Sequence, residues 1–504
     1  MPYAVRGPTV NPRLFADTLH SMALTWADYL VIGGYLAAIT AFGSWFARFQ
    51  RTTRDYFLTD RSVPWWAICF TIVATETSTL TFIGIPAASY TGNMTFLQLA
   101  AGYVIGRLLV SALFIPAYFR GDLFTSYELL QRRFGTSVKA LSASIFLLTR
   151  SLADGIRLFA TALVIAVVTQ LPVSGVIVVL GAAMILYTVR GGVSAVIWTD
   201  VVQMFVYAAG AAAVALALLA RIPGGWAEVV EVGWAAGKFA VLDVSLDVTR
   251  PYTLWAGVLG GIALTLATHG TDQFLVQRLL AARSQRDAVT GLVLSGVLVF
   301  AQFIVFLLIG IMLYAYYLHV PLPRPLSRPD EILPIFVVSS LTNGLAGFIV
   351  AAIVAAALSP SLNAMAATTL QDFYLRYMNP LADQPLQMRV SRSATVVWGI
   401  VQVAVALGAQ LMDRSVLDAG LSVLSFASGS VLGAFLLGTL TSAVRERNVL
   451  VGMVAGLLVM TGVWIGTSVA FTWYVFIGAV TTCAVAWTGA RLAPAPSTVS
   501  VDLR

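Results

Sequence analysis

The stretch "CFTIVATETSTLTFIGIPAASYTGN", residues 69–93, combines the length and apolar character of a membrane-spanning helix with residues that interrupt such a helix. It contains one glutamate, six threonines, two serines, two glycines and one proline. Gly and Pro are tolerated in membrane helices where the freed backbone groups meet another helix or a watery cavity. Glu76 lies about 20 Å into its predicted span, near the membrane midplane. The stretch therefore predicts a broken helix that holds a costly carboxylate in the membrane.

The composition of the whole chain predicts a membrane protein. Of its 504 residues 59% are hydrophobic and only 11% are charged, and the mean hydropathy is +0.86. This is too apolar for a soluble protein. The two cysteines, Cys69 and Cys483, offer no disulfide framework. With only His20, His269 and His319, and no metal-ligand or nucleophile–base motif, the chain is not expected to be an enzyme.

Runs of about 20 apolar residues, separated by Gly/Pro clusters and arginines, predict thirteen membrane helices. The predicted spans are 27–48, 63–91, 93–119, 138–169, 171–190, 193–221, 252–282, 287–318, 343–374, 390–411, 415–441, 447–468 and 471–490.

The arginines indicate the orientation of these spans. They gather on one set of loops, whereas the opposite short loops "SYTGN", "TQLPVS" and "TSVAFT" contain no lysine or arginine. By the positive-inside rule the basic side is cytoplasmic. We therefore expect a multi-pass protein of the plasma (cytoplasmic) membrane, with its N-terminus outside and its C-terminus inside. The net charge of +7 is therefore attributed to contact with the lipid bilayer, and nucleic acid is not expected as a partner.

A second polar interruption, "LATHGTDQF" at residues 266–274, lies in the seventh predicted span. The two interruptions are five helices apart, so two repeats of five would be inverted relative to each other and would each begin with a broken helix. This is typical of transporters whose site lies at the midplane. A polar kink packed inside the bundle is the alternative for either stretch alone.

The domain division expected is 1–62 (external segment, first helix and loop), 63–221 (first repeat), 222–251 (external loop), 252–441 (second repeat) and 442–504 (two helices and a tail).

Ionisable residues inside the spans suggest a cation site. They are Arg107, Arg150 and Arg157 against Glu76, Asp154, Asp200 and Asp272, with His269 nearby. This set leaves one net negative charge if the histidine is neutral, and an unpaired carboxylate attracts a cation or a proton. Glu76 is the main candidate because it lies in the break. Arg150, Asp154 and Arg157 share one helix face, where they form either a structural network or a substrate contact, and Arg107 is interpreted as a counter-charge.

Five motifs in order resemble the sodium:solute symporter family, over about residues 27–460. They are "RTTRDYFLTDRSVPWW" (51–66), "FTSYELLQRRFG" (124–135), "VRGGVSAVIWTDVVQ" (189–203), "TDQFLVQRLLAARSQRDA" (271–288) and "GSVLGAFLLG" (429–438). The resemblance implies an all-α protein with the leucine-transporter fold of five-plus-five inverted helices. It also implies alternating access, sodium as the coupling ion without other cofactors, and a small solute such as a carboxylate, sugar or amino acid. We expect a monomer.

The resemblance also implies particular site residues. Sodium in the family binds between the first and eighth core helices, which are spans two and nine here. The cation-binding residues expected are Ala74, Glu76, Thr77, Ile353, Ala356, Ala357, Ser359 and, from the "WTD" motif, Asp200. The substrate-binding residues that it implies are Ser78, Thr79, Gln98, His269, Asp272 and Gln273. Arg157 is added to this set because the arginines of the fourth span would suit a carboxylate.

The ninth span, "AAIVAAALSPSLNAMAATTLQDFY", departs from the family pattern. The two hydroxyl residues that usually complete the sodium site fall on Ala356 and Ala357, which have no side-chain oxygen. Ser359 and Ser361 lie one turn further on and can compensate, with Glu76 as a hard oxygen ligand. The leading hypothesis is thus sodium-coupled inward symport of a small polar or anionic solute. The alternative is proton-coupled or uncoupled transport, with Glu76 as the protonatable group.

Overall fold

The computed structural model describes residues 24–46, 57–120, 123–342, 344–355, 361–412 and 415–492. These ranges are almost entirely helical, and an isolated β-bridge joins Val63 to Ala282. The helices are α2 Trp26–Phe46, α4 Trp65–Glu76, α5 Thr79–Thr91, α6 Phe96–Leu113, α7 Ile115–Phe119, α8 Tyr127–Phe134, α9 Thr136–Thr169, α10 Val173–Leu219, α11 Gly225–Ala235, α12 Leu254–Gly270, α13 Gln273–Leu280, α14 Gln285–His319, α15 Ile332–Ser340, α16 Leu345–Ala355, α17 Leu362–Thr368, the π-helix η4 Thr369–Met378, α18 Gln384–Ala409, α19 Val416–Leu440, α20 Glu446–Gly466 and α21 Tyr474–Leu492, with short 3₁₀ turns at Thr59–Arg61 (η2), Pro329–Glu331 (η3) and Phe471–Trp473 (η5).

Helices occupy all thirteen predicted spans. Within the described ranges, nine helices are long and apolar enough to cross a membrane, and a bent pair makes a tenth. Shorter apolar helices, Val173–Leu186, Leu254–Gly270 and Leu345–Val354, lie in the remaining three spans. Predicted spans five and six are joined in α10, which is kinked at Gly192 (φ 59°, ψ 179°). The prediction of an all-helical membrane protein is confirmed.

The first predicted break is present between α4 and α5, whose axes differ by 60°. Thr77 and Ser78 leave the helical conformation, with ψ angles of 69° and 175°. Local bonds satisfy part of the freed backbone, since the Ser78 N–H donates to the Glu76 carbonyl (2.8 Å) and so does the Thr81 hydroxyl (2.8 Å). Threonine and serine can bond to nearby backbone in this way, which explains why the polar run ends the helix.

The second predicted break is present between α12 and α13. The Thr271 hydroxyl donates to the Ala267 carbonyl (2.7 Å), and the Asp272 carboxylate accepts from the Phe274 N–H (2.8 Å) as the N-cap of α13. The proposed repeats 63–221 and 252–441 therefore each begin with a discontinuous helix.

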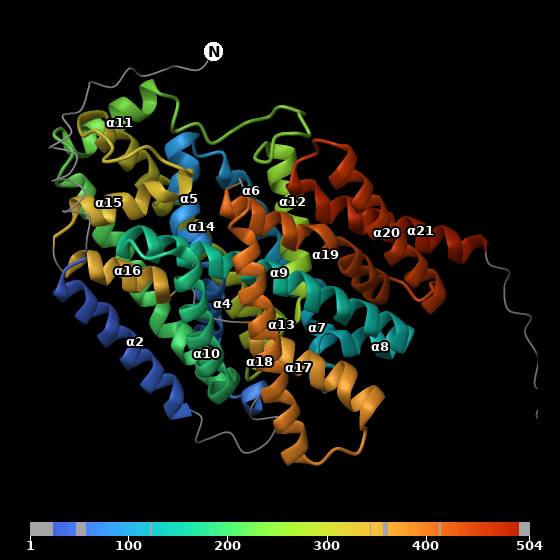
Figure 1. Ribbon diagram of the computed structural model, residues 1–504. Coiled ribbons are helices and arrows are strands. Elements are labelled where there is room, and N and C mark those ends of the chain that lie inside the picture. The colour runs from blue at the N-terminus through green and yellow to red at the C-terminus, as the bar shows by residue number, and fades with distance from the viewer. Residues whose placement is uncertain are drawn as a thin grey trace, which may run out of the picture.

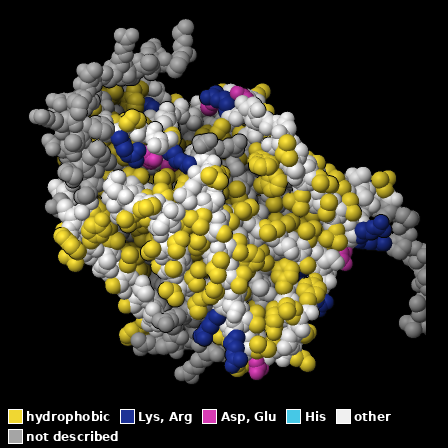
Figure 2. All heavy atoms as spheres, in the orientation of Figure 1, with side chains coloured by type: hydrophobic (Ala, Val, Ile, Leu, Met, Phe, Trp, Pro, Cys, Tyr) yellow, Lys and Arg dark blue, Asp and Glu magenta, His cyan; other side chains and the backbone are white. Residues whose placement is uncertain are grey.

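The broken helices lie in the middle of the bundle, with α2 at one edge and α20 and α21 at the other (Figure 1). In the face shown in Figure 2, hydrophobic side chains cover the broad middle and charged side chains lie mostly near the margins. This distribution suits a protein whose middle faces lipid.

The close packing of α6 on α12 depends on glycines and gives a first prediction. A Cβ at Gly102 would lie 2.5 Å from the Val258 carbonyl oxygen and 2.9 Å from the Gly261 Cα. Because both neighbours are backbone, Gly102→Ala should push the two helices apart, at a cost of about 1–3 kcal/mol. Gly462→Ala is the matched control, because nothing lies within 4 Å of its Cβ position on α20. Thermal unfolding in detergent should show a lower melting temperature for Gly102→Ala alone, and equal melting temperatures would contradict the prediction.

Candidate functional site

A cavity lies between the two broken helices, and α6, α9, α14 and α19 complete its wall. It contains about 120 Å³ of space open to the centre of a water molecule, well above the ~10–15 Å³ that one water needs. Its polar lining includes Thr75, Glu76, Ser78, Thr81, Arg150, Arg157, Thr265, Thr268 and His269, and its aromatic lining includes Phe96, Tyr103, Phe274 and Phe303. A cavity with convergent polar groups and apolar walls is suited to a small solute.

Glu76 is paired with an arginine in this wall. Arg107 is fully buried, and its Nη2 donates to the Glu76 Oε2. The His269 Nε2 lies 3.6 Å from the other Glu76 oxygen, and its Nδ1 lies 2.9 Å from the Thr268 hydroxyl. The interpretation of Arg107 as a counter-charge is consistent with this contact. The expectation that Glu76 is the uncompensated carboxylate is wrong, because α6 brings a cation directly to the break.

Asp200 is also paired, with an arginine that was not among the ionisable residues considered above. Arg278 on α13 is buried, and its Nη2 lies 3.1 Å from the Asp200 Oδ2. The Thr71 hydroxyl donates to the same oxygen (2.6 Å). With Arg278 included, four positive groups face the four predicted carboxylates, so the expected net negative charge is absent from this set. The available signal was the position of Arg278 inside the predicted span 252–282.

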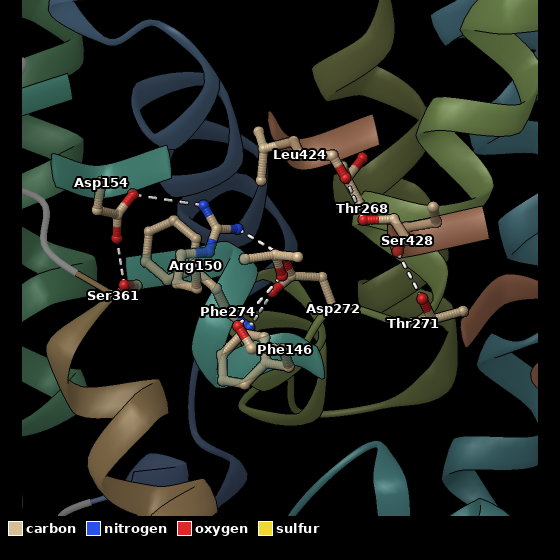
Figure 3. A network of polar contacts seen from close by, with 12 residues as sticks. Phe146, Arg150, Asp154, Thr268, Thr271, Asp272, Phe274, Ser361, Leu424 and Ser428 are labelled. Atoms are coloured by element: carbon tan, nitrogen blue, oxygen red, sulfur yellow. Dashed lines mark hydrogen bonds and ion pairs between the residues drawn. The ribbon is translucent and has the colours of Figure 1, made fainter. Parts of the chain in front are cut away.

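Arg150 holds α9 to the second break. Its Nη2 lies 2.7 Å from the Asp272 Oδ2, and its Nη1 lies 3.5 Å from the Asp154 Oδ1. Figure 3 shows Arg150 between these two carboxylates, with Ser361 donating to the far side of Asp154. The Asp272 carboxylate also caps α13 through the Phe274 N–H (2.8 Å). This is a compensated network, and neither Asp154 nor Asp272 lines the cavity.

Arg157 differs from the other buried arginines. Its Nε lies 4.0 Å from the Asp154 Oδ1, an oxygen already close to Arg150. In the described part of the chain its guanidinium makes no hydrogen bond, although its side chain is only 13% exposed and lines the cavity. A guanidinium has five donors, so Arg157 can still bind an anionic group placed in the cavity.

Of the positions expected to bind a cation, Ala74, Thr77 and Ile353 lie at or against the first break. The Ala74 carbonyl is 3.5 Å from the Tyr207 hydroxyl, and the Thr77 hydroxyl donates to the Gln302 side chain (2.9 Å). The Thr79 hydroxyl donates to the Ile353 carbonyl (3.1 Å), which brings the break against α16.

Ala356, Ala357 and Ser359 lie outside the described residues. Within the described residues no group of three or more His, Cys, Asp or Glu side chains is placed to hold a metal ion. The carbonyl and hydroxyl oxygens near the break, and the Glu76 carboxylate at the end of α4, are of the kind that suits a hard cation.

Only part of the expected substrate set lines the cavity. Ser78, Arg157 and His269 do, whereas Thr79, Asp272, Gln98 and Gln273 do not. Sequence reasoning missed Thr75, Thr81, Tyr103 and Thr268, which are neighbours or helical-turn partners of the residues it named.

The two glutamines bind backbone groups instead of facing the cavity. Gln98 donates to the Tyr252 carbonyl (2.6 Å), and Gln273 accepts from the Ser126 N–H (2.7 Å) and donates to the Phe124 carbonyl (3.1 Å). Both side-chain amides therefore bind the backbone of segments that connect helices.

Comparison with known proteins agrees with this geometry. A model of the sodium:solute symporter family matches residues 56–456. The sodium/sialic acid symporter NanT of Aliivibrio fischeri is 31% identical, with 90% of each chain covered. The human sodium/iodide cotransporter is 30% identical, over 88% of this chain and 70% of the relative.

Solved structures show the same architecture. An outward-open, substrate-bound sodium-coupled sialic acid symporter superimposes with a TM-score of 0.87 at 27% identity, covering 93% of this chain and 98% of that one. The nucleobase–cation symporter Mhp1 matches with a TM-score of 0.57 at 12% identity, covering 87% of this chain and 95% of that one, which shows the fold alone. The predicted leucine-transporter type of fold is confirmed. The chain therefore belongs to the sodium:solute symporter family, as a sodium-coupled, multi-pass membrane carrier and not an enzyme.

Proposed function

We propose that this protein carries a small solute with a carboxylate group inward together with sodium, as a monomer in the cytoplasmic membrane with its N-terminus outside. The observation that carries the proposal is Arg157, a cavity-lining cation whose guanidinium makes no hydrogen bond in the described part of the chain. An unmade hydrogen bond on a buried charged group is costly. A carboxylate can supply two parallel, charge-assisted hydrogen bonds to a guanidinium, whereas an ammonium has no acceptor and a neutral sugar has no negative charge.

The other charges of the cavity wall leave Arg157 available for an anion. Arg107 is held by Glu76, and Arg150 lies between Asp154 and Asp272. A bound carboxylate would therefore meet a site that is close to neutral except for one loosely paired arginine. His269 and Ser78, which also line the cavity, are proposed to contact other polar atoms of the solute.

Sodium is proposed to bind at the first break. The carbonyls of Ala74 and Ile353 and the hydroxyls of Thr77 and Thr79 supply oxygen atoms where α4 meets α5 and α16. A further cation at Asp200 would have to share its carboxylate with Arg278. Coupling to a cation suits an anionic solute, because moving one negative charge into a negative interior costs about 2.3 kcal/mol per 100 mV.

The relatives suggest which solutes to test. Their names give sialic acid, iodide and monocarboxylates as cargo, and all of these are anions. The test is thermal unfolding of the purified protein with sialic acid, pyruvate, lactate, iodide, proline or galactose, each in sodium and in potassium chloride. A bound ligand at 100 times its Kd stabilises by about 2.7 kcal/mol. We expect one carboxylate to raise the melting temperature more in sodium than in potassium. Stabilisation by galactose alone would contradict the proposed solute class.

A further inference from the structure

A buried ion pair joins two helices at the end of the bundle where the arginine-rich loops lie. The Lys139 Nζ on α9 lies 2.9 Å from the Asp372 Oδ1 on η4, and both residues are buried. Lys139 lies about 16 Å along α9 from Arg150, which lines the transport cavity. This end of the bundle is cytoplasmic in the proposed orientation. The pair therefore lies on the cytoplasmic side of the cavity.

Neighbouring elements hold both members of the pair. The Thr125 hydroxyl, in the segment before α8, donates to the Asp372 Oδ1 (3.0 Å). The Lys139 Nζ donates to the side-chain oxygen of Gln131 on α8 (2.9 Å). Asp372 belongs to the π-helix η4, and π-helical turns are rare and occur frequently at functional sites. Polar contacts thus join α8, α9 and η4 around the pair.

The segment before α8 also holds the second broken helix. The Ser126 N–H donates to the side-chain oxygen of Gln273 (2.7 Å), and the Ser126 hydroxyl donates to the Thr271 carbonyl (3.0 Å). Thr271 lies shortly after His269, which lines the cavity. Helices α13 and α17 lie side by side in this part of the bundle (Figure 1). A connected set of contacts therefore runs from the cavity, through the second break, to the ion pair.

The ion pair favours a closed cytoplasmic side. A carrier with alternating access has to open this side to release its solute and sodium. Separating Lys139 from Asp372 without water would leave two uncompensated buried charges, which is costly. The Asp372 Oδ2 makes no hydrogen bond in the described part of the chain, and water in an open passage would supply one. The pair can thus hold the closed form and still separate when water enters.

We propose that Lys139 and Asp372 are positioning residues that keep the transport cavity closed to the cytoplasm, and that their ion pair separates each time the cavity opens on that side. The proposal rests on the proposed orientation of the chain and does not depend on the class of solute. Loss of either charge should therefore shift the carrier toward the form that is open to the cytoplasm, with or without solute.

The test measures access to the cavity from each side of the membrane. Ala153, which lines the cavity, is replaced by cysteine in the full-length protein, whose own cysteines are removed by Cys69→Ala and Cys483→Ala. A membrane-impermeant maleimide is added in sodium buffer without solute, either to intact cells or to inside-out membrane vesicles. The rate of labelling in the vesicles reports opening toward the cytoplasm, and the rate in intact cells reports opening toward the outside.

In this reporter protein, Asp372→Asn and Lys139→Gln should each raise the labelling rate in vesicles about tenfold, which corresponds to a shift of ~1.4 kcal/mol in the equilibrium between closed and open forms. Labelling in intact cells should not rise. The double variant should be labelled no faster than the single variants, because both substitutions act through one pair. An unchanged rate in a folded Asp372→Asn protein would overturn the proposal, and so would a rise in intact cells instead of vesicles.

The matched control is Glu331→Gln, which breaks a different ion pair, that of Glu331 with Arg324 (2.7 Å), in the segment predicted to be external. It should leave the labelling rate in vesicles unchanged. An equal rise in Glu331→Gln and Asp372→Asn would overturn the proposal in favour of a general loosening of the bundle. If Asp372→Asn fails to fold, Thr125→Val keeps both charges and removes one donor to Asp372. It should raise labelling in vesicles about threefold, and an unchanged rate would overturn the proposal.

Discussion

Replacing Arg157 with glutamine is expected to lower sodium-driven uptake of the carboxylate solute at limiting concentration by at least about 100-fold. Each hydrogen bond to a charged group contributes about 1.5–3 kcal/mol, so the loss of a bidentate pair exceeds the ~2.8 kcal/mol that corresponds to this factor. The measurement is the initial rate of uptake into proteoliposomes as a function of solute concentration. Arg157→Lys should lie between the wild type and the glutamine variant, because an ammonium keeps the charge but not the paired geometry.

The stability of the same variants distinguishes a substrate contact from a structural role. Without the Arg157 guanidinium, Asp154 would still have two partners, Arg150 at 3.5 Å and the Ser361 hydroxyl. Arg157→Gln should therefore unfold at nearly the wild-type temperature in the absence of solute. It should also lose the stabilisation that the solute gives the wild type. Unchanged solute affinity in a folded Arg157→Gln protein would show that Arg157 does not bind the solute.

Replacing Glu76 with glutamine is expected to destabilise the protein by about 3–5 kcal/mol, because it leaves Arg107 buried without its carboxylate. Arg107→Met should cost a similar amount for the converse reason. The double variant Glu76→Gln/Arg107→Met should be much more stable than the sum of the two losses allows, since no unpaired charge remains. Thermal or denaturant unfolding of the four proteins completes the cycle. Strictly additive losses would show that the two side chains are not coupled.

Sodium titration of the double variant then separates two roles for Glu76. If its main role is to neutralise Arg107, sodium should still raise the melting temperature of the double variant, through the carbonyl and hydroxyl oxygens at the break. If Glu76 is itself a sodium ligand, this stabilisation should disappear while the fold survives.

The sequence predicts the helices and both breaks because these depend on local composition. The polar run around Thr77 and the "THGTDQF" run interrupt apolar spans, and both helices end within them. The pairing of charges depends instead on how distant helices face each other. Arg278 meets Asp200 across 78 positions in the chain, and the distribution of arginines along the sequence does not give the depth of any one of them in the membrane.

The residues expected to bind the solute show the same division. Ser78 and His269 could be predicted because they lie in the breaks themselves, which the inverted architecture brings to the midplane. Gln98 and Gln273 occupy positions that the family resemblance favours, but their amides are taken up by backbone groups of the connecting segments. An amide in a loop contact and an amide in a cavity have the same sequence signature, so only the packed structure separates them.

Uptake driven by an imposed ion gradient tests the central claim most directly. Proteoliposomes are given an inward sodium gradient, or an inward proton gradient in sodium-free potassium buffer, and accumulation of the stabilising carboxylate is followed over time. We predict accumulation above the external concentration with the sodium gradient, and none with the proton gradient. Equal accumulation with the proton gradient in the absence of sodium, or uptake that ignores both gradients, would contradict sodium-coupled symport.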